Sequence, residues 1–211
     1  MSDWFTRVND AKNSNQDTTC KINKKHKRGR RSVILERDTK NVYRRAFSET
    51  QLLDLIGINQ FKDQHQYNFI TAGDVDALSY LKIIMRQQNL EHLLFSTWCM
   101  AADDIMQFEE WLEDGKIKKL DAYLGEIFPK SYPYEWQKIN EIFEKYKCGK
   151  IAVFRNHSKI FAGYGDKFYF GIQTSANINT NPRTENGCIT IDKKMYEFYN
   201  EYYSGIKSFE K

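Results

Sequence analysis

The 211-residue sequence has no apolar run that approaches the roughly 18 residues needed to span a membrane. Its first residues, Met1 to Arg7, also lack the apolar core of a secretion signal. We therefore expect neither a transmembrane segment nor export, and we predict a cytoplasmic protein.

Cysteine and histidine are scarce and scattered. No C-x-x-C pair occurs, and no histidines have the spacing of metal ligands. This distribution is typical of reduced thiols in a cytosolic protein rather than of disulfides or a zinc site. We therefore predict no metal and no cofactor. The residues concerned are Cys20, Cys99, Cys148, Cys188, His26, His65, His92 and His157.

Positive charge is concentrated near the start of the chain. Residues 1–50 hold 13 Lys and Arg against 6 Asp and Glu, whereas the remainder holds 19 against 22. Such a segment attracts nucleic acid or an anionic membrane, and the alternative is a solvated tail. The candidate nucleic-acid-binding residues are Lys24, Lys25, Lys27, Arg28, Arg30 and Arg31.

The remaining sequence predicts one α/β domain. Residues 1–47 are interpreted as a basic, largely disordered N-terminal arm, and residues 48–211 as the domain. Apolar spacing predicts helices over 48–56, 74–88, 103–114, 134–147 and 193–206. Strands are predicted over 67–71, 93–98, 116–124, 150–161, 167–172 and 187–191. Strands that alternate with helices and then form a hairpin indicate a mixed β-sheet flanked by helices.

One stretch collects residues that suit phosphate chemistry. If residues 151–161 form a strand, His157 and Lys159 project from the same face, because residues two apart share a side. A turn at Gly163–Asp166 returns the chain antiparallel, so that Ser175 and Asn177 arrive at the same end of the sheet. An imidazole beside a cation and neutral donors can attack or protonate a phosphate.

These segments resemble the HKD signature of the phospholipase D superfamily. That signature is H-x-K, four residues, D, and then roughly G-S-x-N. The sequence has Tyr164 at the position of the Asp and Thr174 at that of the Gly. The resemblance covers about the last quarter of the chain, and its segments are His157-Ser-Lys159, Thr174-Ser-Ala-Asn177 and Arg183-Thr-Glu185.

The resemblance implies a metal-independent phosphodiesterase with a phosphohistidine intermediate. His157 would be the nucleophile, Lys159 and Asn177 would stabilise charge on phosphoryl oxygens, and Ser175 would donate a hydrogen bond. Glu185 would orient an imidazole. Members with two motifs build one site from both. A chain with a single motif implies a homodimer in which each subunit supplies one His157.

The substrate interpretation rests on the basic arm and on the missing export signal, which favour an intracellular nuclease acting on DNA. One alternative is a non-catalytic phospholipase D-like module that binds nucleic acid through residues 21–31. Another is a phospholipase that acts at a membrane surface. Each candidate site residue also has an ordinary structural interpretation, as a hydrogen-bonded or solvated side chain in a loop.

Overall fold

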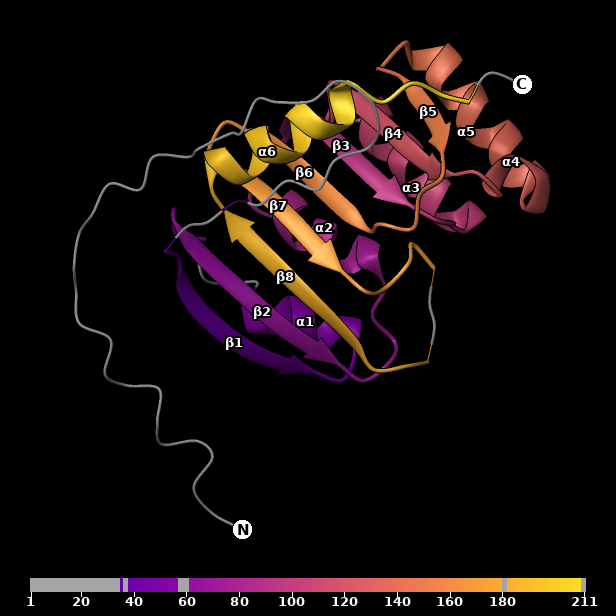
Figure 1. Ribbon diagram of the computed structural model, residues 1–211. Helices are drawn as coiled ribbons and strands as arrows, with labels where there is room; N and C mark the ends of the chain where they lie inside the picture. The colour runs from indigo at the N-terminus through magenta and orange to yellow at the C-terminus, as the bar shows by residue number, and fades with distance from the viewer. Residues whose placement is uncertain (1–34, 36–37, 57–60, 180–181, 210–211) are drawn as a thin grey trace. The chain divides into compact units, whose positions relative to one another are not determined.

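The computed structural model describes Leu35 and residues 38–56, 61–179 and 182–209. The strands are β1 (Lys40–Ala46), β2 (His65–Thr71), β3 (Leu90–Thr97), β4 (Leu120–Gly125), β5 (Ile151–Phe154), β6 (Ile160–Gly165), β7 (Tyr169–Thr174) and β8 (Glu185–Ile191). The helices are α1 (Glu49–Ile56), α2 (Ala77–Met85), α3 (Ala102–Glu113), α4 (Phe128–Ser131), α5 (Pro133–Tyr146) and α6 (Lys193–Ser204). The predicted mixed sheet flanked by helices is confirmed (Figure 1).

All eight strands form one sheet, in the order β1-β2-β8-β7-β6-β3-β4-β5. The pairs β1–β2, β3–β4 and β4–β5 are parallel, and the pairs in between are antiparallel. The carboxyl ends of β3, β4, β5 and β7 therefore lie at the same edge of the sheet as the amino ends of β6 and β8. The loops of the predicted site emerge at this edge, which we call the site edge.

The two faces of the sheet carry separate apolar clusters. The larger cluster packs one face against α1, α2, α3 and α5, and the smaller packs the other face against α6 (Figure 1). Tyr196, Tyr199 and Tyr203 of α6 are buried in the smaller cluster. These three tyrosines, which recur at helical spacing, are thus part of the core.

The start of α2 differs from its prediction. The helix begins at Ala77 and not at Asp74, and Asp76 is the residue that caps it. The Oδ1 of Asp76 accepts a hydrogen bond of 2.8 Å from the backbone N–H of Ser79. Both aspartates satisfy the sequence rule for a cap, and tertiary contacts decide between them.

The predicted strand over residues 150–161 is wrong as a single element. It divides into β5 and β6, and His157 and Lys159 lie in the connection between them instead of on a strand. Because β5 pairs only with β4 in the described sheet while β6 pairs with β3 and β7, this connection crosses the ends of β4 and β3. The predicted hairpin is confirmed, since β6 and β7 pair antiparallel.

The segment predicted to be an N-terminal arm contributes to the sheet. Lys40–Ala46 forms β1, which lies at the edge of the sheet beside β2. No helix in the described part of the chain is long and apolar enough to cross a membrane. The candidate nucleic-acid-binding residues lie outside the described residues; they are Lys24, Lys25, Lys27, Arg28, Arg30 and Arg31.

Candidate active site

The sheet topology brings the predicted site residues to the site edge. His157 and Lys159 precede β6, Ser175 and Asn177 follow β7, and Glu185 begins β8. A backbone hydrogen bond joins the last two of these segments, because the N–H of Ser175 donates to the carbonyl oxygen of Asn186 at 3.1 Å.

His157 and Lys159 contact each other within the β5–β6 connection. The Nζ of Lys159 lies 3.0 Å from Nδ1 of His157 and 2.9 Å from the carbonyl oxygen of the same residue. The His157 ring is exposed, with the Trp98 ring 5.4 Å away between centroids, whereas Lys159 is only 8% exposed. A solvent-accessible imidazole therefore lies beside a buried cation.

The environment of Lys159 disfavours its charge. Burial lowers the pKa of the ammonium below its ordinary value, while the neighbouring Cys99 and Glu185 act in the opposite direction. Burial also raises the pKa of the Cys99 thiol, although a hydrogen bond from Tyr132 and the Lys159 charge oppose this shift. The ammonium is therefore a desolvated cation, and such a cation interacts more strongly with an anion than a hydrated one does.

Ser175, after β7, and Glu185, at the start of β8, form a pair at the site edge. The hydroxyl of Ser175 donates to Oε2 of Glu185 and accepts a hydrogen bond of 3.0 Å from the N–H of Asn186. The resemblance gives Glu185 the role of orienting an imidazole. In the structure its carboxylate accepts from Ser175, and its charge acts on Lys159.

Asn177 is held between two helix starts. Its carbonyl oxygen accepts a hydrogen bond of 3.1 Å from the N–H of Ala77, at the start of α2. The next residue, Ile178, accepts one of 3.0 Å from the N–H of Ala101, immediately before α3. The Oδ1 of Asn177 is buried and has no hydrogen-bond partner among the described residues. It therefore retains an unused acceptor at the site edge.

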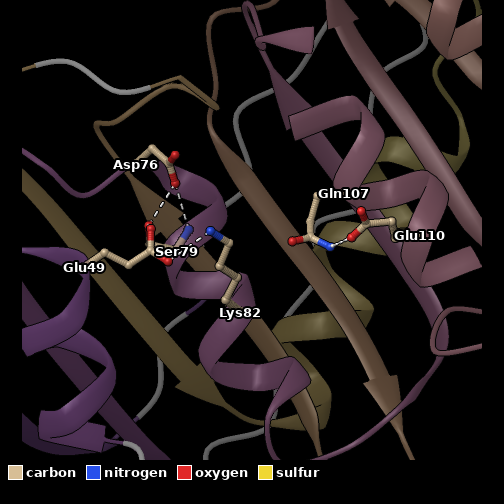
Figure 2. A network of polar contacts seen from close by, with 6 residues as sticks. All are labelled: Glu49, Asp76, Ser79, Lys82, Gln107 and Glu110. Atoms are coloured by element: carbon tan, nitrogen blue, oxygen red, sulfur yellow. Dashed lines mark hydrogen bonds and ion pairs between the residues drawn. The ribbon is translucent and has the colours of Figure 1, made fainter. Parts of the chain in front are cut away.

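A polar network at the start of α2 supports this position. Figure 2 shows Ser79 between Glu49 of α1 and the capping Asp76, with its hydroxyl 2.8 Å and 3.0 Å from their carboxylates. Lys82 adds an ion pair of 2.9 Å with Glu49. These contacts join α1 to α2 and so position the start of α2, where the N–H of Ala77 donates to Asn177. No group of three or more His, Cys, Asp and Glu side chains in the described residues is placed to hold a metal ion.

Comparisons with known proteins identify the fold. No protein-family model and no curated protein match the sequence. Phosphatidylserine synthase of Haemophilus influenzae Rd KW20 matches with a TM-score of 0.50 and 15% identity, covering 66% of this chain and 38% of its own. Polyphosphate kinase of Porphyromonas gingivalis matches with a TM-score of 0.50 and 10% identity, covering 73% of this chain and 27% of its own.

The fold is phospholipase D-like. At such low identity the likeness to both matched proteins concerns the fold alone. The chain spans well under half the length of either protein.

Tyr164 stands at the position where the resemblance to the HKD signature would place an Asp. It lies on β6, paired with Tyr169 across the hairpin and away from the site edge. Its ring stacks on Tyr169 at 4.9 Å and meets Tyr196 edge-on at 5.1 Å. The position therefore contributes apolar packing under α6 where the signature has an acid.

Sequence reasoning missed the polar residues beneath the His157 loop. Asn156 and Ser158 flank His157, and their side chains bond with Ser96 of β3 and Tyr203 of α6. The sequence offers one signal for them, since Asn156 and Ser158 are polar residues that alternate with His157 and Lys159. Their role becomes visible only once the ends of β3 and β4 are known to lie beneath this loop.

Proposed function

We propose that the chain is a metal-independent phosphodiesterase that cleaves DNA, with His157 as its nucleophile. The observation that carries the proposal is the contact between Lys159 and His157, with Nζ 3.0 Å from Nδ1, at the edge that Ser175 and Asn177 also reach. An exposed nucleophile beside a desolvated cation suits attack on a phosphate anion. The names of both structural relatives refer to phosphate compounds, which is consistent with this class of substrate.

The chemistry divides into two displacements. In the first, a ring nitrogen of His157 attacks phosphorus and the P–O bond to the leaving group breaks. A second imidazole, which is protonated, gives the leaving oxygen its proton. In the second, the second imidazole takes a proton from water, the water oxygen attacks phosphorus, and the P–N bond breaks to release His157. Lys159 and the amide of Asn177 stabilise the phosphoryl oxygens, and the second imidazole acts first as the acid and then as the base.

The second imidazole comes, we propose, from a second copy of the chain. Of the histidines in the described residues, His65 begins β2 at the opposite edge and His92 is buried beside Asp121. Among the described histidines only His157 is at the site edge. A two-fold dimer that brings both copies of His157 together supplies the required acid and base. Sedimentation of the active species should then give twice the 25.1 kDa mass of the chain.

The choice of DNA rests on the basic sequence between Lys21 and Arg31. Lys and Arg that neutralise DNA phosphates release counterions, so affinity should fall as the salt concentration rises. Removing residues 1–31 should weaken DNA cleavage at low salt and leave turnover of a small phosphodiester unchanged.

The decisive experiment compares the wild type with His157→Ala in excess EDTA. The substrates are plasmid DNA, bis(p-nitrophenyl) phosphate and phosphatidylcholine vesicles. His65→Ala serves as the matched control, because His65 is a partly exposed histidine at the opposite edge of the sheet. We expect DNA and the chromogenic ester to be cleaved by the wild type and by His65→Ala, but not by His157→Ala.

Other outcomes identify the alternatives. Cleavage of the vesicles ahead of DNA would replace the nuclease with a phospholipase. Absence of all turnover, together with salt-sensitive DNA binding, would replace the enzyme with a binding module. Turnover that survives in His157→Ala would remove His157 from the mechanism.

A further inference from the structure

The connection that carries His157 is anchored by the residue before it. Asn156 is 6% exposed, and its side chain is buried at the ends of β3 and β4. The Nδ2 of Asn156 lies 2.9 Å from the hydroxyl of Ser96, 3.0 Å from the carbonyl oxygen of Tyr123 and 3.3 Å from that of Thr97. One amide group therefore joins this connection to two neighbouring strands.

The other half of the same amide organises the connection itself. Its Oδ1 accepts hydrogen bonds from the backbone N–H of Ser158 at 3.0 Å and from the Ser158 hydroxyl at 2.6 Å. The backbone N–H of Asn156 donates to Oε2 of Glu126 at 3.1 Å. These contacts fix the backbone on both sides of His157.

Ser158 extends the anchor to the opposite layer. Its hydroxyl lies 2.7 Å from the hydroxyl of Ser96 and 2.7 Å from that of Tyr203 on α6. The chain also passes very close to the end of β4, where a Cβ at Gly125 would lie 3.2 Å from the carbonyl oxygen of Asn156. The connection is thus held from below by two strands and from one side by a helix.

We propose that Asn156 is the positioning residue of the candidate active site. The inference rests on the proposed function, because it assigns Asn156 the task of holding His157 and Lys159 in the geometry for attack. Asn156 itself touches neither of the reacting groups. Loss of its amide would leave the Tyr123 and Thr97 carbonyls without this donor and would release the backbone at Ser158. A displacement of about 1 Å at a reacting group lowers the rate by about 10²-fold.

A purely structural role for Asn156 predicts a different result, and Gln88 provides the comparison. Gln88 is 5% exposed and anchors the far hairpin with its amide. It donates to the carbonyl oxygen of Phe168 at 3.0 Å and accepts from the N–H groups of Lys167 and Phe168 at 3.1 and 3.0 Å. Gln88→Ala therefore removes the part-buried hydrogen bonds of a buried amide at the opposite edge of the sheet.

The test measures kcat and KM for bis(p-nitrophenyl) phosphate in Asn156→Ala, Asn156→Asp and Gln88→Ala, each below its own melting temperature. We expect kcat to fall by about 10²-fold in Asn156→Ala with KM within about threefold of the wild type. Asn156→Asp preserves shape but turns an oxygen toward two carbonyls, so it should lose kcat as well. Gln88→Ala should lose thermal stability and keep kcat.

A substrate-free measurement separates this inference from the proposed function. The His157 ring protons lie near the Trp98 ring, so their NMR shifts report the position of the connection. We expect the shifts to move toward those of a free histidine in Asn156→Ala and to stay in place in Gln88→Ala. An inactive wild type would refute the proposed function, and the NMR result would still decide the role of Asn156. Unchanged shifts in Asn156→Ala, or a kcat equal to that of the wild type, would overturn the inference.

Discussion

The Nζ of Lys159 lies 3.0 Å from Nδ1 of His157, although Lys159 is 8% exposed and His157 is accessible to solvent. A positively charged group is thus held at low local dielectric beside the proposed nucleophile. Burial lowers the pKa of this ammonium, so its charged form costs the fold more than that of an exposed lysine would. Such a cost is typical of a group retained for electrostatic stabilisation of a transition state.

Replacing Lys159 by Met should separate charge from packing. Methionine keeps the aliphatic length, so we expect folding to be preserved, and kcat for a phosphodiester should fall by about 10²- to 10³-fold. Lys138→Met on α5 is the control, because Lys138 is a partly exposed residue paired with Glu141. Steady-state kinetics in EDTA provide the measurement. Wild-type turnover in Lys159→Met would exclude the charge from catalysis.

Glu185 should set the alkaline limit of activity through the same lysine. Its negative charge raises the pKa of Lys159 against the larger effect of burial. In Glu185→Gln that pKa falls further, and activity that needs the ammonium is lost at a lower pH. Because Gln still offers Ser175 an acceptor, kcat at the optimum should fall by less than about tenfold. Asp166→Asn, which removes an exposed carboxylate in the turn between β6 and β7, is the control. A Glu185→Gln profile of rate against pH that coincides with those of the wild type and the control would contradict the role of Glu185.

The sequence predicts the fold well where the signal is local. The helical spacing of Tyr196, Tyr199 and Tyr203 identifies a core helix, and glycines between two apolar runs identify the β6–β7 hairpin. The start of α2 is ambiguous locally, because Asp74 and Asp76 can both cap. The hydrogen bond from the backbone N–H of Ser79 to Asp76 shows which aspartate lies at the helix start.

The site is predicted less completely, because its geometry depends on pairing between distant strands. The strand-like pattern over residues 150–161 continues through the connection between β5 and β6. No local feature reveals that β6 pairs with β3 and is separated from β5 by two strands. The topology still brings the H-x-K and Ser175 segments to one edge, as the hairpin predicts. Asn156 reads as an ordinary loop residue until the carbonyls of Thr97 and Tyr123 are placed beneath it.

Asp104, in the first turn of α3, should make stability depend on pH near neutrality. Burial is the main cause that raises its pKa to about 7, followed by the charge of Asp76. Between pH 3.8, the ordinary value, and about 7 the folded protein holds a proton that the unfolded chain has released. Stability therefore falls as the pH rises through this range.

Asp104→Asn should remove that dependence. At pH 8 the variant should exceed the wild type by about 1 to 2 kcal/mol, a discounted value because Asp104 is partly exposed. The difference should vanish near pH 4. Urea denaturation at both pH values measures it, with the exposed neighbour Asp103→Asn as the control. Equal stability of Asp104→Asn and the wild type at pH 8 would show that the carboxyl is not destabilised by its surroundings.

Asp121 should have the opposite dependence, because its ionised form is stabilised beneath α6. The Nε2 of His92 lies 3.1 Å from Oδ2 of Asp121, and His92 also lies 2.8 Å from the hydroxyl of Tyr196. Burial alone would raise the pKa of Asp121, but the hydrogen bond from His92 and the charge of Lys119 hold it below its ordinary value. Ionised Asp121 thus contributes stability above pH 3.8, and the contribution is lost as the pH falls through the lowered pKa.

Asp121→Ala should therefore destabilise the protein by about 3 to 5 kcal/mol at pH 7, since it leaves His92 without its buried partner. The difference from the wild type should shrink as the pH falls below 3.8, because the unfolded chain then takes up a proton that folded Asp121 binds only at a lower pH. Asp114→Ala is the matched control, because the Asp114–Lys116 pair is about half exposed and should contribute less than about 1 kcal/mol. Urea denaturation between pH 7 and pH 3 decides the outcome. A loss in Asp121→Ala no larger than that in Asp114→Ala would mean that the His92 contact does not stabilise the packing of α6.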